Sequence, residues 1–320
     1  MGIGAIFKKQ GGFSLVKNYA YNYVLFYALC VFVVVPKTKK GLELFRECVG
    51  LKIYARVKRK YKGVVQKFLS EKTDCPAEVD LQKPKIIWFC WLQGLENAPS
   101  LVKKCYESIK TQCSDYEIRI ITAENFSLWA DIPEFIITKW KDGMISHAHF
   151  SDILRTALLV KNGGTWIDAT VLLTGKIPSD IEAAPLFLFR TFKPGSDGKT
   201  TTLSSWFISA CPNATVLGLA QNLLYEYWKK HNYLCDYFLF HIFVQTALDA
   251  LADQTERIPP YTNETPHLML FELGNLFSEE KWESITSQSF CHKLTNKLTN
   301  AVMNREATFY KHIVLGDWDK

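Results

Sequence analysis

The segment from Ser146 to Thr174 constrains the fold more than any other part of the chain. A helix-like pattern runs through 146–161 and ends at the paired glycines Gly163 and Gly164, which suit a helix end that needs a positive φ. A short strand-like run follows, and Asp168 stands at its end. The succession of helix, glycine turn, strand and carboxylate predicts an α/β protein with an acidic group at the edge of a sheet.

Strand-like and helix-like runs alternate from residue 84 onward. A buried strand is predicted at 84–91, a helix at 99–111 and a second strand at 116–121. This alternation predicts a doubly wound α/β sheet. Ligands of open α/β sheets gather outside the carboxyl ends of the strands, so Gln93 and Gly94, in the loop after the first strand, become candidate ligand-binding residues. Farther along we expect a strand at 204–210, helices at 214–230, 236–251 and 291–297, and a closing loop at 301–316.

Two pairs of polar residues flank the glycines. Asp152 and Arg155 lie three positions apart on the predicted helix and share a face, where the aspartate could meet ribose hydroxyls and the arginine a phosphate or a carboxylate. The alternative is a surface ion pair worth only ~0.3–0.5 kcal/mol, but the nearby glycine stop and Asp168 favour a ligand site. Asp168 and Thr170 are two positions apart, so in extended backbone both side chains project to one side and could hold a divalent ion.

Positive charge is concentrated at the start of the chain. Residues 1–72 hold 15 Lys or Arg and 3 Asp or Glu, a balance of +12, whereas the whole chain carries +6, so the remainder is acidic at −6. We predict a basic, aromatic, helical arm at 1–72, a linker at 73–83 and a single body at 84–320. Such an arm suits an anionic partner, either membrane phospholipid or nucleic acid, and no nucleic-acid-binding motif accompanies it.

The arm contains an apolar run, Tyr23–Val35, of 13 uncharged residues, fewer than the ~20 that a membrane-spanning helix needs. A basic helix is predicted after it, at 42–69. We expect the arm to lie on an anionic membrane surface; a helical hairpin packed on the body is the alternative, and a secretory-pathway protein anchored by 19–35 is a minor one. Nine cysteines without a Cys-x-x-Cys pair fit a reducing compartment and give no zinc signature.

Two stretches of the body resemble a known family. Residues 84–94 and 146–174 resemble the capsular polysaccharide synthesis proteins, which are bacterial sugar transferases similar to glycosyltransferase family 32. The resemblance extends weakly to 205–210 and 236–241. It rests on the combination of Ser151-Asp152-Ile153-Leu154-Arg155, Gly163-Gly164 and Trp166-Ile167-Asp168. It implies a GT-A-like fold with a Rossmann-type sheet, a nucleotide-sugar donor, most readily a UDP-sugar, and usually a retaining mechanism.

The resemblance also assigns roles to the polar pairs. Asp152 matches the acid that contacts the donor ribose, and Arg155 the arginine that steadies the donor. Asp168 matches the first acid of an Asp-x-Asp motif that binds manganese or magnesium. Thr170 stands where the wider family has the second acid, and a hydroxyl is a weaker ligand than a carboxylate. A divalent metal at Asp168 and Thr170 is therefore an expectation that this substitution weakens.

Further candidates complete the expected site. Trp88, Trp166 and Ile167 join Gln93 and Gly94 as donor-binding candidates. Asp236 either caps a helix or binds sugar hydroxyls as a catalytic residue, and both readings stay open. Trp206, Trp228 and Tyr237 either stack on sugars or pack in the core. Lys293 and Lys297 are candidates for reaching a pyrophosphate from late in the chain.

These expectations describe a peripheral enzyme on the cytoplasmic face of a bacterial inner membrane. It would transfer a sugar to a saccharide or lipid-linked saccharide acceptor of a growing surface polysaccharide, without a nucleic-acid partner. The alternative is a non-catalytic, membrane-tethered glycan-binding or scaffold protein that keeps the fold, and Thr170 is its best support.

Overall fold

The centre of the molecule is a mixed five-stranded sheet. The computed structural model describes residues 12–73, 83–191 and 200–316. In the order β2-β1-β3-β6-β5, β1 pairs in parallel with β2 and β3, whereas β6 runs antiparallel to β3 and β5. The strands are β1 Ile86–Cys90, β2 Glu117–Ile121, β3 Gly164–Ile167, β5 Leu186–Arg190 and β6 Leu203–Ala210.

The predicted α/β class is confirmed, and the parallel β2-β1-β3 part with its flanking helices is Rossmann-type. The doubly wound sheet is a correction, because β5 and β6 form an antiparallel pair that extends the sheet without a helical crossover between them. The antiparallel pairing has a consequence for the site. It sets Phe207 opposite Ile167, so that the start of β6 lies at the same edge as the end of β3.

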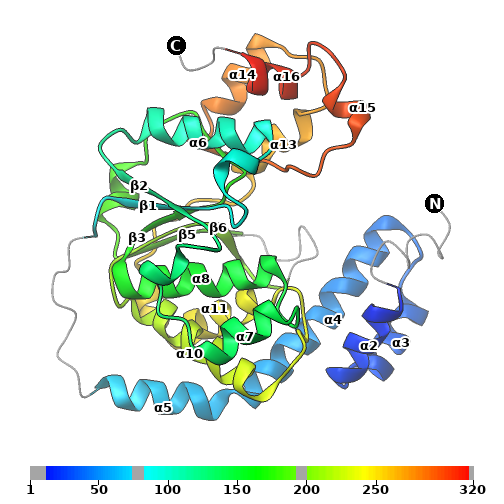
Figure 1. The fold of residues 1–320 in the computed structure, drawn as a ribbon. Helices are drawn as coiled ribbons and strands as arrows, with labels where there is room; N and C mark the ends of the chain where they lie inside the picture. Colours follow the sequence, from blue (N-terminus) through cyan, green and yellow to red (C-terminus); the bar gives the residue numbers. More distant parts are fainter. Residues whose placement is uncertain (1–11, 74–82, 192–199, 317–320) are drawn as a thin grey trace.

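Helices cover both faces of this sheet (Figure 1). The helices α8 His147–Asn162, α10 Thr215–Lys230 and α11 Leu239–Ala250 lie on one face, and α6 Ser100–Gln112 lies on the other. Successive strand residues point to opposite faces: Trp88 of β1 joins the core under α8, whereas Ile87 and Phe89 join the core on the α6 side. Shorter helical segments are η1 Leu95–Asn97, η2 Phe126–Leu128, α7 Glu134–Lys141, α9 Ser179–Ala183 and α12 Ala252–Glu256.

A second, two-stranded sheet joins the centre to a C-terminal lobe. Strand β4 Val171–Leu173 pairs antiparallel with β7 Cys291–Lys293. The helix predicted at 291–297 is therefore wrong, because the backbone of this segment bonds to β4 instead. The predicted closing loop at 301–316 is also wrong, because it contains a helix that packs on α6 (Figure 1). The lobe consists of η3 Thr265–His267, α13 Leu268–Glu272, α14 Glu279–Thr286, α15 Asn300–Met303 and α16 Phe309–Leu315.

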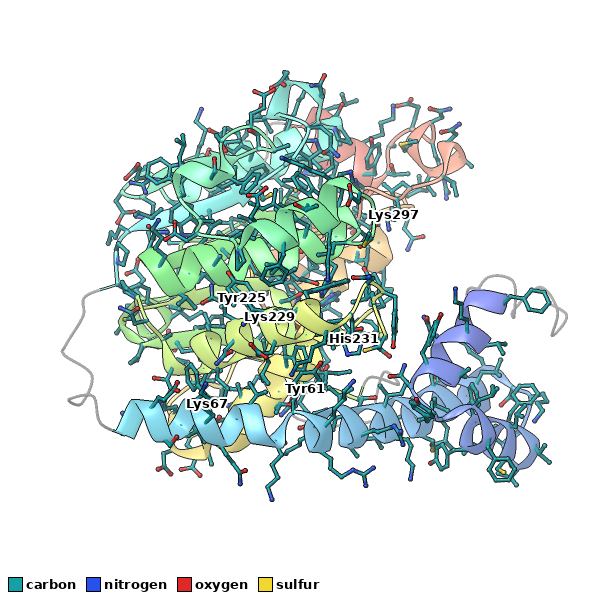
Figure 2. All side chains as sticks on the ribbon, turned by 60° about the horizontal axis from the view of Figure 1, so that its bottom comes forward. Tyr61, Lys67, Tyr225, Lys229, His231 and Lys297 are labelled. Atoms are coloured by element: carbon teal, nitrogen blue, oxygen red, sulfur yellow. The ribbon has the colours of Figure 1, made fainter. Side chains whose placement is uncertain are left out.

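The N-terminal arm is helical and packs on the body. Its helices are α2 Phe13–Tyr21, α3 Leu25–Val34, α4 Lys39–Lys60 and α5 Lys62–Thr73, so the single helix predicted at 42–69 is interrupted at Tyr61. The ring of Tyr61 meets that of Phe243 edge-on at 5.2 Å, and α5 lies along α10 (Figure 2). Within the described ranges, none of the helices combines the length and the apolar character needed to cross a bilayer.

Candidate functional site

Helix α8 and the two glycines after it set the position of β3. The Ser146 hydroxyl accepts the His149 backbone N–H at 3.2 Å and so caps the helix start. The helix ends as predicted, with Gly163 at φ 69° and Gly164 at φ 93°. A Cβ on Gly164 would come within 2.6 Å of the Ile86 carbonyl oxygen in β1. Any larger residue would push β3 away from β1 and displace the segment that follows.

Asp168 lies in a tight turn directly after β3. Its backbone N–H donates to the Trp206 carbonyl at 2.8 Å, and its own carbonyl accepts the Val171 N–H at 3.0 Å. The prediction of extended backbone at Asp168 and Thr170 is therefore wrong, because the chain turns here to enter β4. The turn nevertheless leaves both side chains in contact with the same group, Lys293.

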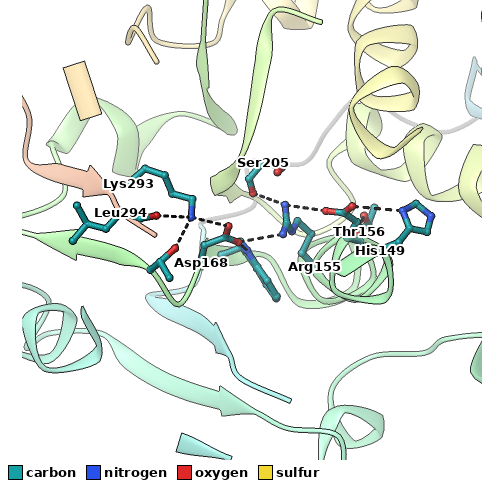
Figure 3. A network of polar contacts seen from close by, with 10 residues as sticks. His149, Arg155, Thr156, Asp168, Ser205, Lys293 and Leu294 are labelled. Atoms are coloured by element: carbon teal, nitrogen blue, oxygen red, sulfur yellow. Dashed lines mark hydrogen bonds and ion pairs between the residues drawn. The ribbon is translucent and has the colours of Figure 1, made fainter. Parts of the chain in front are cut away.

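Arg155 links the helix to this turn (Figure 3). Its guanidinium donates to the Ser205 carbonyl at 2.7 Å and to Asp168 Oδ1 at 3.1 Å, and Nη1 lies 3.3 Å from Asp152 Oδ1. The Arg155 side chain is 5% exposed and that of Asp152 is 14% exposed. The intrahelical ion pair weighed from the sequence does form, but it is buried and continues to Asp168.

The charges around Arg155 keep Asp152 ionised. Burial alone would raise the pKa of the Asp152 carboxyl, but Arg155 and the neighbouring His149 and His241 lower it by more, so its pKa lies below the ordinary value. His149 is held in turn by Trp228, whose indole N–H donates to its Nε2 at 3.1 Å. Asp152 therefore serves as a permanent negative partner of Arg155.

The two carboxylate oxygens of Asp168 face different neighbours. Oδ1 accepts hydrogen bonds from Arg155 and from the Trp166 indole N–H, the latter at 2.8 Å. Oδ2 faces Lys293, whose ammonium nitrogen lies 3.7 Å away and donates to the Thr170 hydroxyl at 2.5 Å (Figure 3). A carboxylate between two cations is the outcome of bringing together α8, β3 and β7.

Some predicted donor-binding side chains lie in the core instead. Trp88 and Ile167 have no exposed surface, and Trp166 is 1% exposed. The Trp88 indole N–H donates to the Gly163 carbonyl at 2.8 Å, which holds the end of α8 on the sheet. These side chains support the site and do not line it, because Trp88 and Trp166 are covered in the core under α8 and Ile167 in the core on the α6 side. Among the predicted donor-binding residues, Gln93 and Gly94 lie in the loop after β1, at the sheet edge.

That loop holds Gln93 and Gly94 beside the end of β3. Gly94 has a φ of 83°, and Gln93 is exposed, with its carbonyl accepting the Asn97 side-chain N–H at 2.8 Å. Cys90, at the end of β1, is the nearby thiol. Burial raises the pKa of Cys90 to about 12, so the thiol stays protonated and is no nucleophile.

A cavity of about 530 Å³ opens beside this edge, between the arm and the body. The arm contributes side chains of α2 and α4 to its wall, and the body contributes the start of β6, the segment before α11 and the segment around η3. Its polar lining includes Asn18, Tyr19, Arg46, Ser205, Asp236, His241, Asn263 and His267. Ser205 and Trp206 belong both to this wall and to the backbone contacts of Arg155 and Asp168.

Asp236 lies at the cavity wall, where its Oδ1 accepts the Phe238 backbone N–H at 2.7 Å. Burial raises the pKa of this carboxyl above its ordinary value, although the Phe238 N–H opposes the shift. Both interpretations left open by the sequence remain compatible with this position, since the residue stabilises the turn before α11 and also faces the cavity.

The aromatic candidates separate clearly. Trp228 is fully buried, whereas Tyr237 is 67% exposed at the cavity. Trp206 is 5% exposed, stacks on Phe189 at 4.5 Å and donates its indole N–H to Asn263 Oδ1 at 3.1 Å. Trp228 is therefore a core residue, and Tyr237 is the ring with surface available for a sugar.

The comparison with protein families decides the family of the chain. The model of the capsular polysaccharide synthesis proteins matches residues 41–313. The chain belongs to this family. A solved structure titled "PaToxG Glycosyltransferase" is similar over 76% of this chain and 95% of that chain, with 14% sequence identity and a TM-score of 0.34. No curated protein matches the chain.

The match to the capsular polysaccharide synthesis family begins within α4, and it therefore includes α4 and α5 together with the body. The family resemblance predicted from the sequence is confirmed, and the likeness to glycosyltransferase family 32 stays a prediction. The residues Asp152, Arg155 and Asp168 that carried the resemblance form one connected network in this family member.

The donor set at Asp168 does not fit a divalent cation, because its oxygen atoms already have partners. One or two carboxylates with waters and substrate phosphates can hold magnesium, but Asp168 Oδ2 and the Thr170 hydroxyl already face the ammonium group of Lys293. The other carboxylate oxygen is taken by Arg155 and Trp166. In the described part of the chain, no group of three or more His, Cys, Asp or Glu side chains is placed to hold a metal ion.

Several residues of the site escaped prediction from the sequence. Ser205 contributes through its backbone carbonyl, which no side-chain pattern reveals. Asn263 and His267 reach the cavity from the start of the C-terminal lobe, and Arg46 from the arm. Lys293 does reach the turn, whereas among the described residues no hydrogen bond or ion pair joins the exposed Lys297 side chain to the site.

Proposed function

We propose that this protein is a nucleotide-sugar-dependent glycosyltransferase that adds a sugar to a capsular or other surface polysaccharide. One observation carries the proposal. Arg155, Asp168 and Lys293 converge at the carboxyl edge of β1 and β3, beside a cavity with a polar wall. Ligands of open α/β sheets bind at this edge, and cations there suit a diphosphate leaving group. Membership of the capsular polysaccharide synthesis family supports it.

The reaction demands stabilisation of charge on the departing nucleotide. The bond between the sugar C1 and the β-phosphate oxygen breaks, and its electron pair stays on the phosphate. The acceptor hydroxyl oxygen bonds to C1, and its proton passes to the departing phosphate oxygen. The neighbourhood of Asp168 supplies cations for the developing charge. A retaining transfer of this kind needs no protein nucleophile, consistent with the protonated Cys90 at the sheet edge.

The test is transfer from a panel of UDP- and GDP-sugars, with UDP-sugars expected to be the donors. Product anomers followed by NMR would show retention of configuration if the proposal is right, and inversion would remove that part of it. Calorimetry distinguishes the enzyme from a non-catalytic scaffold, because a scaffold that lost its donor site binds no nucleotide-sugar. The active-site assignment requires that donor turnover falls when Asp168 is replaced.

We assign Asp236 and the cavity to the saccharide acceptor. Asp236→Asn keeps an oxygen for the Phe238 N–H but removes the charge, so we expect the acceptor KM to rise about tenfold. Asp253→Asn, on the exposed surface, is the control.

The same variant tests the effect of pH on stability. Because burial raises the pKa of Asp236, its ionisation lowers the stability of the folded state as pH rises through that pKa. Relative to the natural chain, the variant should therefore be more stable above that pKa than below the ordinary carboxyl pKa, and an unchanged KM would remove the acceptor role.

The arm supports peripheral attachment to the cytoplasmic face of the bacterial inner membrane. On α3, Phe26, Leu29 and Val33 share one helix face and are 82%, 57% and 78% exposed. Exposed lysines at 37, 39 and 40 follow the helix. Apolar residues next to lysines suit an anionic lipid surface. The packing of α4 and α5 on the body leaves this face of α3 available.

Vesicle co-sedimentation tests the attachment. Replacing both Phe26 and Val33 by Ser should weaken binding to phosphatidylglycerol vesicles about tenfold, while leaving activity on a water-soluble acceptor unchanged. Leu315→Ser, at an equally exposed apolar position on α16, is the matched control. Equal binding of all three proteins would contradict the membrane role of α3.

A further inference from the structure

Lys293 approaches the Asp168 turn from a distant part of the chain. It is the last residue of β7, and the pairing of β4 with β7 sets it opposite Val171. Because Val171 directly follows Thr170, this register delivers the ammonium group to the turn. Lys293 and Thr170 are 123 positions apart in sequence. The placement is therefore a product of the small second sheet.

The ammonium group lies between the Thr170 hydroxyl and the Asp168 carboxylate. It donates to the Thr170 hydroxyl at 2.5 Å and to the Leu294 carbonyl at 3.4 Å, and it lies 3.7 Å from Asp168 Oδ2. The contact to Thr170 is direct, whereas the distance to Asp168 is longer than a hydrogen bond. The Thr170 hydroxyl thus positions the ammonium group by a hydrogen bond, whereas the Asp168 carboxylate offsets its charge without a hydrogen bond to it.

Both Lys293 and Asp168 remain open to a ligand. The Lys293 side chain is 20% exposed and that of Asp168 is 24% exposed, whereas Arg155 on the opposite side is 5% exposed. An ammonium at the rim can approach a phosphate oxygen, while the buried guanidinium holds Asp168 in place. A threonine in place of a second acid also removes one negative charge that would compete with the phosphates for the ammonium.

We propose that Lys293, in place of a divalent cation, supplies the positive charge that binds the donor diphosphate at the Asp168 turn. The inference rests on the proposed function and deepens it. Lys293 contacts the phosphate oxygen that receives the electron pair of the breaking C1–O bond, and it transfers no proton. Thr170 positions the ammonium, and donor binding does not require metal.

Calorimetry with UDP and GDP as probes tests this inference on the full chain. We expect the Kd of the preferred nucleotide to be the same in EDTA and in excess Mn²⁺. Lys293→Met keeps most of the side-chain volume and should weaken binding about 10–100-fold in EDTA. Lys176→Met, at an exposed lysine after β4, is the matched control and should bind like the natural chain. Melting temperatures show whether each variant is folded.

Mn²⁺ binding, followed by electron paramagnetic resonance, provides a readout independent of the nucleotide. Removing the ammonium in Lys293→Met should raise Mn²⁺ affinity above that of the natural chain, and adding Asp168→Asn should abolish the gain. Nucleotide binding that requires Mn²⁺ or Mg²⁺ in the natural chain, or that survives Lys293→Met unchanged, overturns the inference and leaves the proposed function standing. Absence of nucleotide binding in every condition overturns both.

Discussion

The two sides of Asp168 are built in different ways. On the Oδ1 side, Arg155 and Trp166 come from the same contiguous segment as the aspartate and are almost wholly buried. On the Oδ2 side, Lys293 arrives from a strand far along the chain and is partly exposed. The buried side fixes the geometry of the carboxylate, and the open side is where a ligand can meet a cation. The partners of Oδ1 therefore position the Asp168 carboxylate, and the partner of Oδ2 is the one that is open to a ligand.

The largest effect is expected from Asp168→Asn, which affects both sides at once. The amide retains an oxygen for Trp166 but removes the charge that balances Arg155 and Lys293. We expect donor turnover to fall about 10³-fold. Rates of sugar transfer measure the effect, with Asp131→Asn, at an exposed ion pair with Lys161, as control. Turnover within a few-fold of the natural chain would reject the site.

Arg155→Lys separates the buried side from the open one. A lysine cannot reach the Ser205 carbonyl, Asp152 and Asp168 together, because it lacks the planar fork of the guanidinium. We expect turnover to fall about 10²-fold and the free energy of unfolding to drop by about 2–4 kcal/mol. Denaturant titration measures the second quantity. Loss of activity without loss of stability would mean that Arg155 contacts substrate and does not only position Asp168.

Acid should lower the free energy of unfolding through His292, which precedes Lys293 in β7. Burial lowers the pKa of His292 to about 4. The unfolded chain therefore binds this proton at higher pH than the folded chain, and stability falls as pH drops from about 6.5 toward 4, by about 1.4 kcal/mol per unit for one proton. Unfolding measured across this range should show a smaller slope in His292→Asn. Identical slopes would show that another group controls the acid response.

The smallest effect is expected from Trp166→Phe, which removes one hydrogen bond from the buried side. The indole N–H to Asp168 Oδ1 is lost, while an aromatic ring remains beside the Arg155 guanidinium, whose carbon lies 4.9 Å from the tryptophan ring centre. We expect a loss of about 1 kcal/mol in stability and a few-fold loss in turnover. Thermal unfolding and transfer rates measure these. An effect on the scale of Asp168→Asn would show that the buried side also takes part in binding.

The sequence predicted the local backbone elements around Asp168 well. The helix, the two positive-φ glycines, the short strand and Asp168 all follow from patterns within about one supersecondary unit, where side-chain spacing and backbone demands are visible. The strands that carry Trp88 and Ile167 end at the site, but both side chains are buried in the core. Which face of a strand is covered depends on the helices packed against it, and that is not a property of the strand itself.

The non-local half was accessible only in outline. The sequence makes Lys293 a candidate for a pyrophosphate contact but predicts a helix for its segment. The strand has no sequence signal because β7 is three residues long and gains its hydrogen bonds from β4. The antiparallel pairing of β6 with β3, which brings Ser205 to Arg155, likewise has no local signature. Short strands and backbone carbonyls escape sequence patterns because tertiary partners determine them.

The seating of the arm on the body has a practical consequence. Tyr61 is 3% exposed against Phe243, and Val49, Ile53 and Val57 of α4 are buried as well. A version cut at the start of the sheet, for crystallisation or for overproduction, would lose these residues, expose the apolar surface of the body that they cover, including Phe243, and invite self-association. A version that starts at Lys39 would keep α4 and α5 on this surface, but it would lose α2 with α3, and α2 forms part of the cavity wall.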